Sequence, residues 1–129
     1  MVQKRYYSLE EANRLLPDIS RQLLALKQAR EEIAIKRLKI ERARRDQSAD
    51  DPDHFFVEEA EVEFMVIAAR QQIEHLTSQS IEVKDIDAGL VDFLTLIDGR
   101  EAYPCWRSGE PTIRFWHGLN EGFAARKVL

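Results

Sequence analysis

Residues able to bind ligands or metals are concentrated in the last third of the 129-residue chain. This part contains the only cysteine, Cys105, and one of the three histidines, His117. A thiol and an imidazole can ligate zinc or form a nucleophile pair, while arginines and carboxylates bind groups of opposite charge. We select seven candidate ligand-binding residues: Asp85, Asp87, Cys105, Arg107, Glu110, Arg114 and His117.

Several carboxylates of this region could join Cys105 and His117 as metal ligands: Asp85, Asp87, Asp92, Asp98, Glu101 and Glu110. Their spacing matches no recognised metal motif. Asp85 and Asp87 would lie on one side of a strand, but such a pair is common by chance. Turn formation and pairing with arginines explain the carboxylates more simply. The sequence therefore predicts no metal site and leaves the cofactor open.

A catalytic pairing of Cys105 with His117 depends on how their strands are aligned. A hairpin with a four-residue loop within Arg107–Thr112 would set three pairs opposite each other: Trp106 and Ile113, Pro104 and Phe115, and Ala102 and His117. This register puts Cys105 and His117 on opposite faces, which argues against a nucleophile pair. A slip of one residue would exchange the two faces.

In this register one face of the hairpin is apolar and would meet the helices. The other face would mix aromatic, thiol and guanidinium groups: Tyr103, Cys105, Arg107, Thr112, Arg114 and Trp116. If this second face meets solvent, it is the best candidate surface for a small ligand. Packing within the sheet nevertheless explains Trp106 and Trp116 more simply than an aromatic ligand-binding site does.

A long helix is expected upstream of this region, starting at Ser8. The Ser8 hydroxyl can cap the helix while the Glu11 side chain reaches back to the Ser8 amide. Apolar residues over residues 9–40 recur at alternating steps of three and four, a heptad pattern interrupted by Arg30 and Arg37. Pro17 should kink this helix or lie in the first turn of a restarted one.

A second helix is predicted from about Phe55 or Phe56 to about Ser78, with apolar residues on two adjacent faces. The turn-forming segment Asp46–Asp53 predicts a loop, so the helices form an antiparallel, coiled-coil-like hairpin over about residues 8–79. The second helix presents more apolar surface than the first can cover. We therefore expect a homodimer whose hairpins pack in a four-helix arrangement.

Residues 81–129 are predicted to form a small antiparallel sheet with the N-terminal segment near it. Ile81–Ile86 alternates apolar and polar residues, Asp87–Gly89 and Asp98–Gly99 supply turns, and aromatic-rich segments follow. The expected fold class is therefore α+β, in a single domain over residues 1–129.

The net charge of −4 divides into +4 over residues 1–50 and −8 over residues 51–129. The segment Lys36–Arg45 holds six basic residues and one acid, a helical patch of the kind that binds nucleic-acid phosphates. Antiparallel packing would bring it against the acidic segment Glu58–Glu63, which explains the charges within the hairpin. Because no aromatic residue lies among the basic ones, we favour this internal pairing over nucleic-acid binding.

Distinctive motifs extend along the chain. They are Tyr7–Asn13 with Leu15–Pro17, Val83–Phe93, Gly99–Glu101, Cys105–Arg107, Gly109–Pro111, Trp116–His117 and Gly122–Ala124. In these motifs the chain resembles, over essentially its whole length, the uncharacterised prokaryotic family catalogued as DUF2203. The resemblance implies no activity that could be transferred to this chain.

Two positions depart from the pattern of that family. Ala102 and Pro104 stand where larger aliphatic strand formers are expected. Proline cannot donate to a sheet ladder, so Pro104 favours an edge strand or a bulge over a regular central strand.

Composition narrows the class of protein. With 44% hydrophobic and 33% charged residues, the chain is neither disordered nor collagen-like. The longest apolar run, Phe64–Ala69, is too short to span a bilayer, and no apolar stretch follows the first basic residues. A single cysteine excludes an internal disulfide. We expect a cytoplasmic protein without a membrane partner.

These observations favour a non-enzymatic coiled-coil oligomerisation or protein-interaction module. One alternative is a small metal-binding or ligand-binding protein, or an enzyme, that uses the C-terminal sheet region. A further alternative is nucleic-acid binding through residues 36–45. Substrate, cofactor and partner are left open by the sequence.

Overall fold

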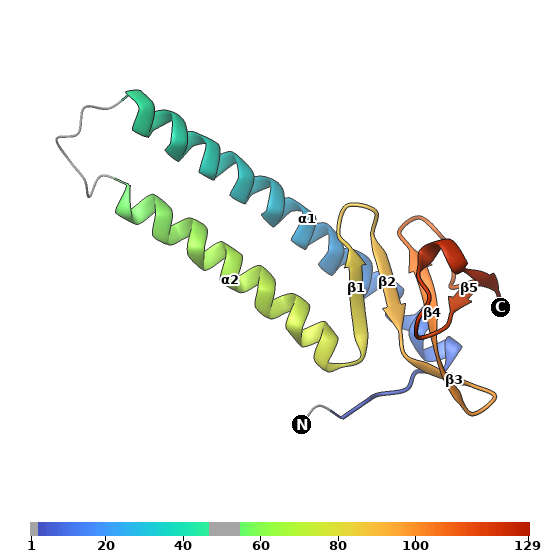
Figure 1. Cartoon of the computed structure of the whole chain (residues 1–129). Coiled ribbons are helices and arrows are strands. Elements are labelled where there is room, and N and C mark those ends of the chain that lie inside the picture. Colours follow the sequence, from blue (N-terminus) through green and yellow to red (C-terminus); the bar gives the residue numbers. More distant parts are fainter. Residues whose placement is uncertain (1–2, 47–54) are drawn as a thin grey trace.

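The computed structural model describes residues 3–46 and 55–129 as two helices followed by a six-stranded antiparallel sheet (Figure 1). The predicted α+β fold class is confirmed. The elements are α1 Leu9–Asp46, α2 Phe56–Ser78, β1 Ile81–Asp85, β2 Leu90–Phe93, β3 Thr95–Ile97, β4 Arg100–Arg107, β5 Phe115–His117 and β6 Lys127–Val128, with a short 3-10 helix at Phe123–Ala125. Among the described residues, neither helix combines the length and apolarity needed to cross a membrane.

Helix α1 begins with the capping arrangement expected from the sequence. The Glu11 N–H donates to Ser8 Oγ at 3.0 Å, and the Ser8 N–H donates to the Glu11 carboxylate at 3.0 Å. The helix then continues through Pro17 without a break, so a restart at Pro17 is wrong. Leu16 and Ile19, on either side of the proline, are buried in the same core, and this packing offsets the one backbone hydrogen bond that proline removes.

Helix α2 runs back beside α1, and together they form a hairpin that projects from the sheet (Figure 1). Its bounds agree with the predicted second helix, while nearly all of the predicted loop at Asp46–Asp53 lies outside the described residues. Five of the six buried residues of α1 lie at or before Leu26, and only Val62 and Leu76 are buried in α2. The outer part of the hairpin therefore has little core of its own.

In the sheet the strands follow the order β1-β2-β4-β5-β6, and β3 pairs with the first part of β4. Strand β4 is therefore central, and the expectation of an edge strand at Pro104 is wrong. On one side β4 pairs with β3 up to Ala102 and with β2 from Cys105 onward, so Pro104 lies where β4 changes partners. On that side Pro104 is paired with neither β2 nor β3, so its missing N–H removes no hydrogen bond between strands.

The register of β4 and β5 differs by one residue from the predicted one. His117 pairs with Tyr103, whereas the prediction paired it with Ala102. The connection between the strands is longer than a four-residue loop and spans residues 108–114. Because side chains alternate along a strand, this shift moves His117 to the face that carries Cys105. The prediction that the two side chains lie on opposite faces is wrong.

The main core lies between the sheet and the first half of α1, with the end of α2 beside it. It contains Tyr7, Ala12, Leu16, Ile19, Leu23, Leu76, Ile81, Val91, Phe93, Trp106 and Ile113. Tyr7 ties the N-terminal segment to both layers, because its hydroxyl donates to the Gln79 carbonyl at 2.7 Å and its N–H to the Leu94 carbonyl at 2.9 Å. The predicted position of the N-terminal segment near the sheet is confirmed.

Candidate functional site

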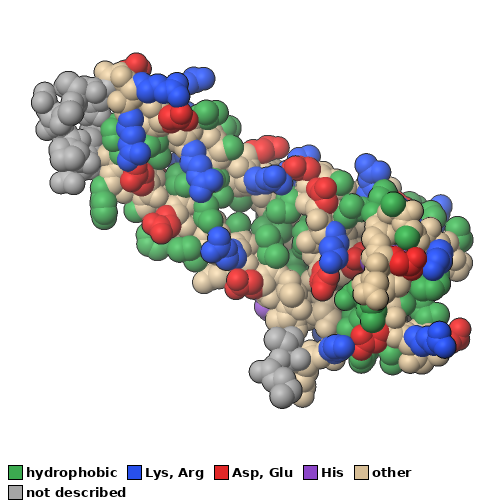
Figure 2. Space-filling model, viewed as in Figure 1, with side chains coloured by type: hydrophobic (Ala, Val, Ile, Leu, Met, Phe, Trp, Pro, Cys, Tyr) green, Lys and Arg blue, Asp and Glu red, His purple; other side chains and the backbone are tan. Residues whose placement is uncertain are grey.

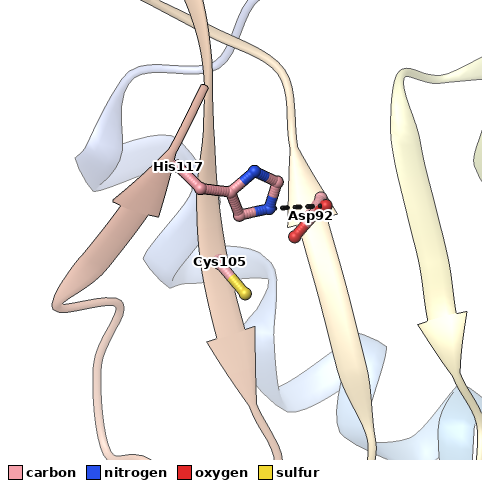
Figure 3. A group of neighbouring side chains, drawn as sticks. All are labelled: Asp92, Cys105 and His117. Atoms are coloured by element: carbon pink, nitrogen blue, oxygen red, sulfur yellow. Dashed lines mark hydrogen bonds and ion pairs between the residues drawn. The ribbon is translucent and has the colours of Figure 1, made fainter. Parts of the chain in front are cut away.

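Three polar side chains meet on the sheet, one from each of three adjacent strands (Figure 3). Asp92 of β2 pairs with Cys105 of β4, and His117 of β5 pairs with Tyr103, two residues from Cys105. Alternation therefore places all three on one face of the sheet. Their ligand atoms lie within 4.8 Å of one another, and Asp92, Cys105 and His117 are 1%, 2% and 3% exposed. We call these three residues the buried cluster.

Both ring nitrogens of His117 are in hydrogen-bond contact. Nε2 lies 2.9 Å from Asp92 Oδ2, and Nδ1 lies 2.9 Å from the carbonyl oxygen of Gly118. A carbonyl oxygen only accepts, so Nδ1 carries a proton and donates it. The other carboxylate oxygen, Asp92 Oδ1, is buried without a hydrogen-bond partner among the described residues. Because buried polar atoms are nearly always paired, this oxygen leaves the cluster incomplete.

The surroundings of Cys105 keep its thiol protonated. Burial raises the pKa of this thiol to about 12, and the negative charge of Asp92 acts in the same direction. At neutral pH the side chain is a thiol, whereas the nucleophile in cysteine catalysis is the thiolate. The cluster therefore gives no support to a catalytic cysteine, although His117 does lie on the same face.

Beside the buried cluster, Arg126 ties the C-terminal segment to β4 and to the loop that follows it. Its guanidinium donates to the two carboxylate oxygens of Glu110 at 2.6 and 2.9 Å, and to the Cys105 carbonyl at 3.3 Å. The same group lies 4.1 Å from the centroid of the Phe115 ring. Glu110, one of the predicted ligand-binding residues, is therefore already engaged by the protein.

Of the seven predicted ligand-binding residues, the structure brings Cys105 and His117 into direct proximity. Four others are exposed elsewhere on the surface: Asp85, Asp87, Arg107 and Arg114. Asp87, for example, pairs with Arg30 of α1 at 3.2 Å. Their role in ligand binding stays a prediction.

Sequence reasoning did not select Asp92 or Arg126. Asp92 counted only as one of several carboxylates able to bind a metal, although it interrupts the apolar run Leu90–Leu94. A charged residue inside a buried strand needs a partner, so this interruption is the signal that could have singled it out. For Arg126 the sequence offers no comparable signal.

A second feature is an open groove between α1 and α2. Beside the β1–β2 turn it has a volume of about 620 Å³, with an apolar floor that includes Ile33, Val66 and Ile73. Past Arg37 it continues toward the tip of the hairpin, where its volume is about 440 Å³. In Figure 2 hydrophobic side chains lie among lysines and arginines along the hairpin. We call this feature the hairpin groove.

Charged side chains pair across the hairpin as the sequence predicts. Lys36 of α1 lies 3.8 Å from the carboxylate of Glu61, and Arg44 forms an ion pair with Glu59. The predicted contact between Lys36–Arg45 and Glu58–Glu63 is confirmed. These side chains are 35–57% exposed, so each pair adds little to stability.

Comparison with known proteins gives one match. A family model described as "Uncharacterized conserved protein (DUF2203)" matches residues 5–129. No curated protein and no solved structure matches the chain. The match covers nearly the whole chain, including both the hairpin and the sheet.

Proposed function

The chain belongs to the uncharacterised DUF2203 family, and we propose that it is a self-association module in which two copies pack with their hairpin grooves facing each other. The observation that carries this proposal is the open groove itself. Its floor is apolar, and half-buried residues such as Val66 and Ile73 line it on α2. An apolar surface of this kind on a projecting helix pair marks an association site.

Charge complementarity favours a second copy of this chain as the occupant. Residues 27–45 of α1 contain eight basic and three acidic side chains, whereas α2 contains five glutamates and one arginine. A two-fold axis that lies between two hairpins and runs parallel to their helices sets each α1 beside the α2 of the other copy. Every helix of the resulting four-helix arrangement then has neighbours of opposite net charge.

Single charged residues on the rim of the groove also favour a second copy of this chain as the occupant. Arg37 and Arg70 line the groove, and neither forms an ion pair with another described residue. Glu63 of α2 is exposed and likewise has no ion pair within the described ranges. Glutamates of a second copy would supply partners for Arg37, since α2 of that copy lies next to α1.

Light scattering coupled to size-exclusion chromatography tests the proposal. The wild-type protein is expected to show the mass of a dimer at micromolar concentration, and Val66→Glu, which puts a charge in the groove, the mass of a monomer. Leu24→Glu is the matched control. Leu24 is 57% exposed and lies half a helical turn around α1 from the groove residue Leu26, so this variant should remain a dimer.

Circular dichroism of both variants shows whether the helices are intact. A monomeric wild-type protein at micromolar concentration contradicts the proposal. Dissociation by Leu24→Glu with retention of the dimer by Val66→Glu would place the interface on the other side of the hairpin.

Nucleic-acid binding through residues 36–45 remains the competing function for the same helix. The ion pairs of Lys36 and Arg44 with α2 favour an internal role for these charges. Binding of a nucleic acid with an affinity that falls steeply with salt concentration would support the competing function.

A further inference from the structure

We propose that Asp92, Cys105 and His117 bind a divalent metal ion of the zinc class. They offer a carboxylate oxygen, a sulfur and an imidazole nitrogen within 4.8 Å of one another. Zinc binds this mixture of ligands, whereas magnesium and calcium require oxygen ligands. This site is independent of the self-association proposed for the hairpin, because it lies on the sheet.

The unpartnered oxygen of Asp92 is the first observation that points to a cation. Asp92 is 1% exposed, and its Oδ1 atom has no hydrogen-bond partner among the described residues. A carboxylate oxygen left without a partner in a protein interior is strongly unfavourable. Figure 3 shows this carboxylate and the Cys105 sulfur directed into the same space beside His117. A cation in that space would give the oxygen the partner that it lacks.

The orientation of His117 is the second observation. Its Nδ1 donates to the Gly118 carbonyl, which leaves Nε2 directed at the cluster. Metal-binding histidines are usually held in this way, with the distal ring nitrogen bonded to a backbone carbonyl or a carboxylate. The turn that supplies the carbonyl is itself fixed, because the Gly118 N–H donates to Glu121 at 2.8 Å and Glu121 pairs with Lys127 at 3.2 Å.

Metal binding requires a modest contraction of the cluster and the loss of two protons. Tetrahedral zinc with ordinary bond lengths places its ligand atoms about 3.3–3.6 Å apart, so the widest separation must close by roughly 1 Å. The Cys105 S–H proton leaves to solvent as the metal–sulfur bond forms. The proton of the hydrogen bond between Nε2 and Asp92 Oδ2 also leaves to solvent, and each of these two atoms then bonds to the metal.

The position of the three ligands indicates a structural role for the metal. They come from β2, β4 and β5, so one ion would link three adjacent strands. Strands β5 and β6 contain only three and two residues, and such short strands are weakly held by their ladders alone. With all three ligands at most 3% exposed, the site is closed to a substrate, and three protein ligands leave the fourth position of tetrahedral zinc to a water molecule.

Titration with cobalt(II) tests this site in the 129-residue chain after treatment with a chelator. Cobalt(II) replaces zinc and reports its ligands, because a bound thiolate gives a charge-transfer absorption in the near ultraviolet. We expect this absorption to saturate at one cobalt per chain and to disappear when zinc is added. The temperature of unfolding should rise with either metal.

Variants identify the ligands. Cys105→Ala is expected to abolish the charge-transfer band, and His117→Gln to abolish stoichiometric binding. His75→Gln is the matched control, because His75 is exposed on α2 and should leave binding unchanged. Wild-type protein that takes up neither metal overturns the proposal, as does a band that persists in Cys105→Ala. The cobalt spectrum of the wild type decides the matter even where a variant fails to fold.

Discussion

The hairpin and the sheet depart from the usual distribution of side chains in opposite directions. On the hairpin, apolar side chains that include Val66 and Ile73 line an open groove. On the sheet, a carboxylate and an imidazole lie almost completely buried, at 1% and 3% exposure for Asp92 and His117. Exposed apolar surface and buried polar groups are the informative exceptions in a folded protein.

The difference shows what each region lacks. An apolar groove is satisfied by more protein, which is why we propose a second chain as the partner of the hairpin. A buried carboxylate oxygen is satisfied by a cation or a donor, which is why we propose an ion, needing no large opening, for the cluster at Asp92. The same chain can therefore carry an assembly surface and a closed site that do not depend on each other.

The largest effect is expected from breaking the buried cluster. His117→Ala leaves the Asp92 carboxylate without its hydrogen-bond partner at 2.9 Å in an interior position. Leaving a buried polar group without its partner costs about 1–3 kcal/mol, and more when the group is charged. Urea unfolding of the metal-free protein measures this loss, and His75→Ala on the exposed side of α2 should change stability by less than about 0.5 kcal/mol.

A double variant separates two contributions to the loss of stability: the loss of the His117–Asp92 contact and the cost of leaving the Asp92 charge buried without a partner. Asp92→Ala combined with His117→Ala leaves no buried charge, so it should be less destabilising than the sum of the two single variants. Strict additivity would mean that the two side chains do not interact in the folded protein.

The reactivity of Cys105 should be the next largest effect. In the folded, metal-free protein the raised pKa of about 12, against a normal 9.0, leaves about a thousandfold less thiolate at neutral pH. Alkylation should be correspondingly slow and should become fast in denaturant. Because folding raises this pKa, the thiol's contribution to stability is present below the pKa of the unfolded thiol and is lost as pH rises toward 12. Rapid alkylation of the folded protein would show that the cluster opens.

Much of the fold could be predicted because helices are specified by local patterns. Ser8 and Glu11 form the predicted cap, and the heptad positions of α1 form the predicted buried stripe. The opposite charges of the two helices also predicted which ends would pair. All these signals lie within one helix or between two helices joined by a short segment.

The site was less predictable because it depends on the register of strands. A loop of seven residues, 108–114, in place of four moves His117 by one position and brings it to the face of Cys105. The third member, Asp92, lies on β2, which β3 separates from β4 along the chain, and the sequence predicted no register for this pair of strands. Spacing along the sequence reports neither relation, so a metal motif could not be recognised.

A smaller effect is expected when the charge on the rim of the hairpin groove is reversed. Arg37→Glu places a negative charge beside the glutamates of the second copy, and the dimer dissociation constant should rise about tenfold at low salt. The difference should shrink as salt is added. Lys39→Glu, which makes the same charge change on the opposite side of the hairpin, is the control. Sedimentation equilibrium measures both constants, and equal weakening by the two variants would mean that net charge, and not the groove, is responsible.

The smallest effect should come from the most exposed aromatic ring of α2. Phe64 and the groove residue Val66 lie on different sides of the helix, so two copies that pack groove against groove leave Phe64 in solvent. Phe64→Ser should therefore change the free energy of unfolding by less than about 0.5 kcal/mol and leave the dimer dissociation constant unchanged. Chemical denaturation and sedimentation equilibrium measure the two quantities. If Phe64→Ser dissociates the dimer while Val66→Glu does not, the second copy binds the side of α2 that carries Phe64 and not the hairpin groove. The hairpin would still be the region that associates, through a different surface.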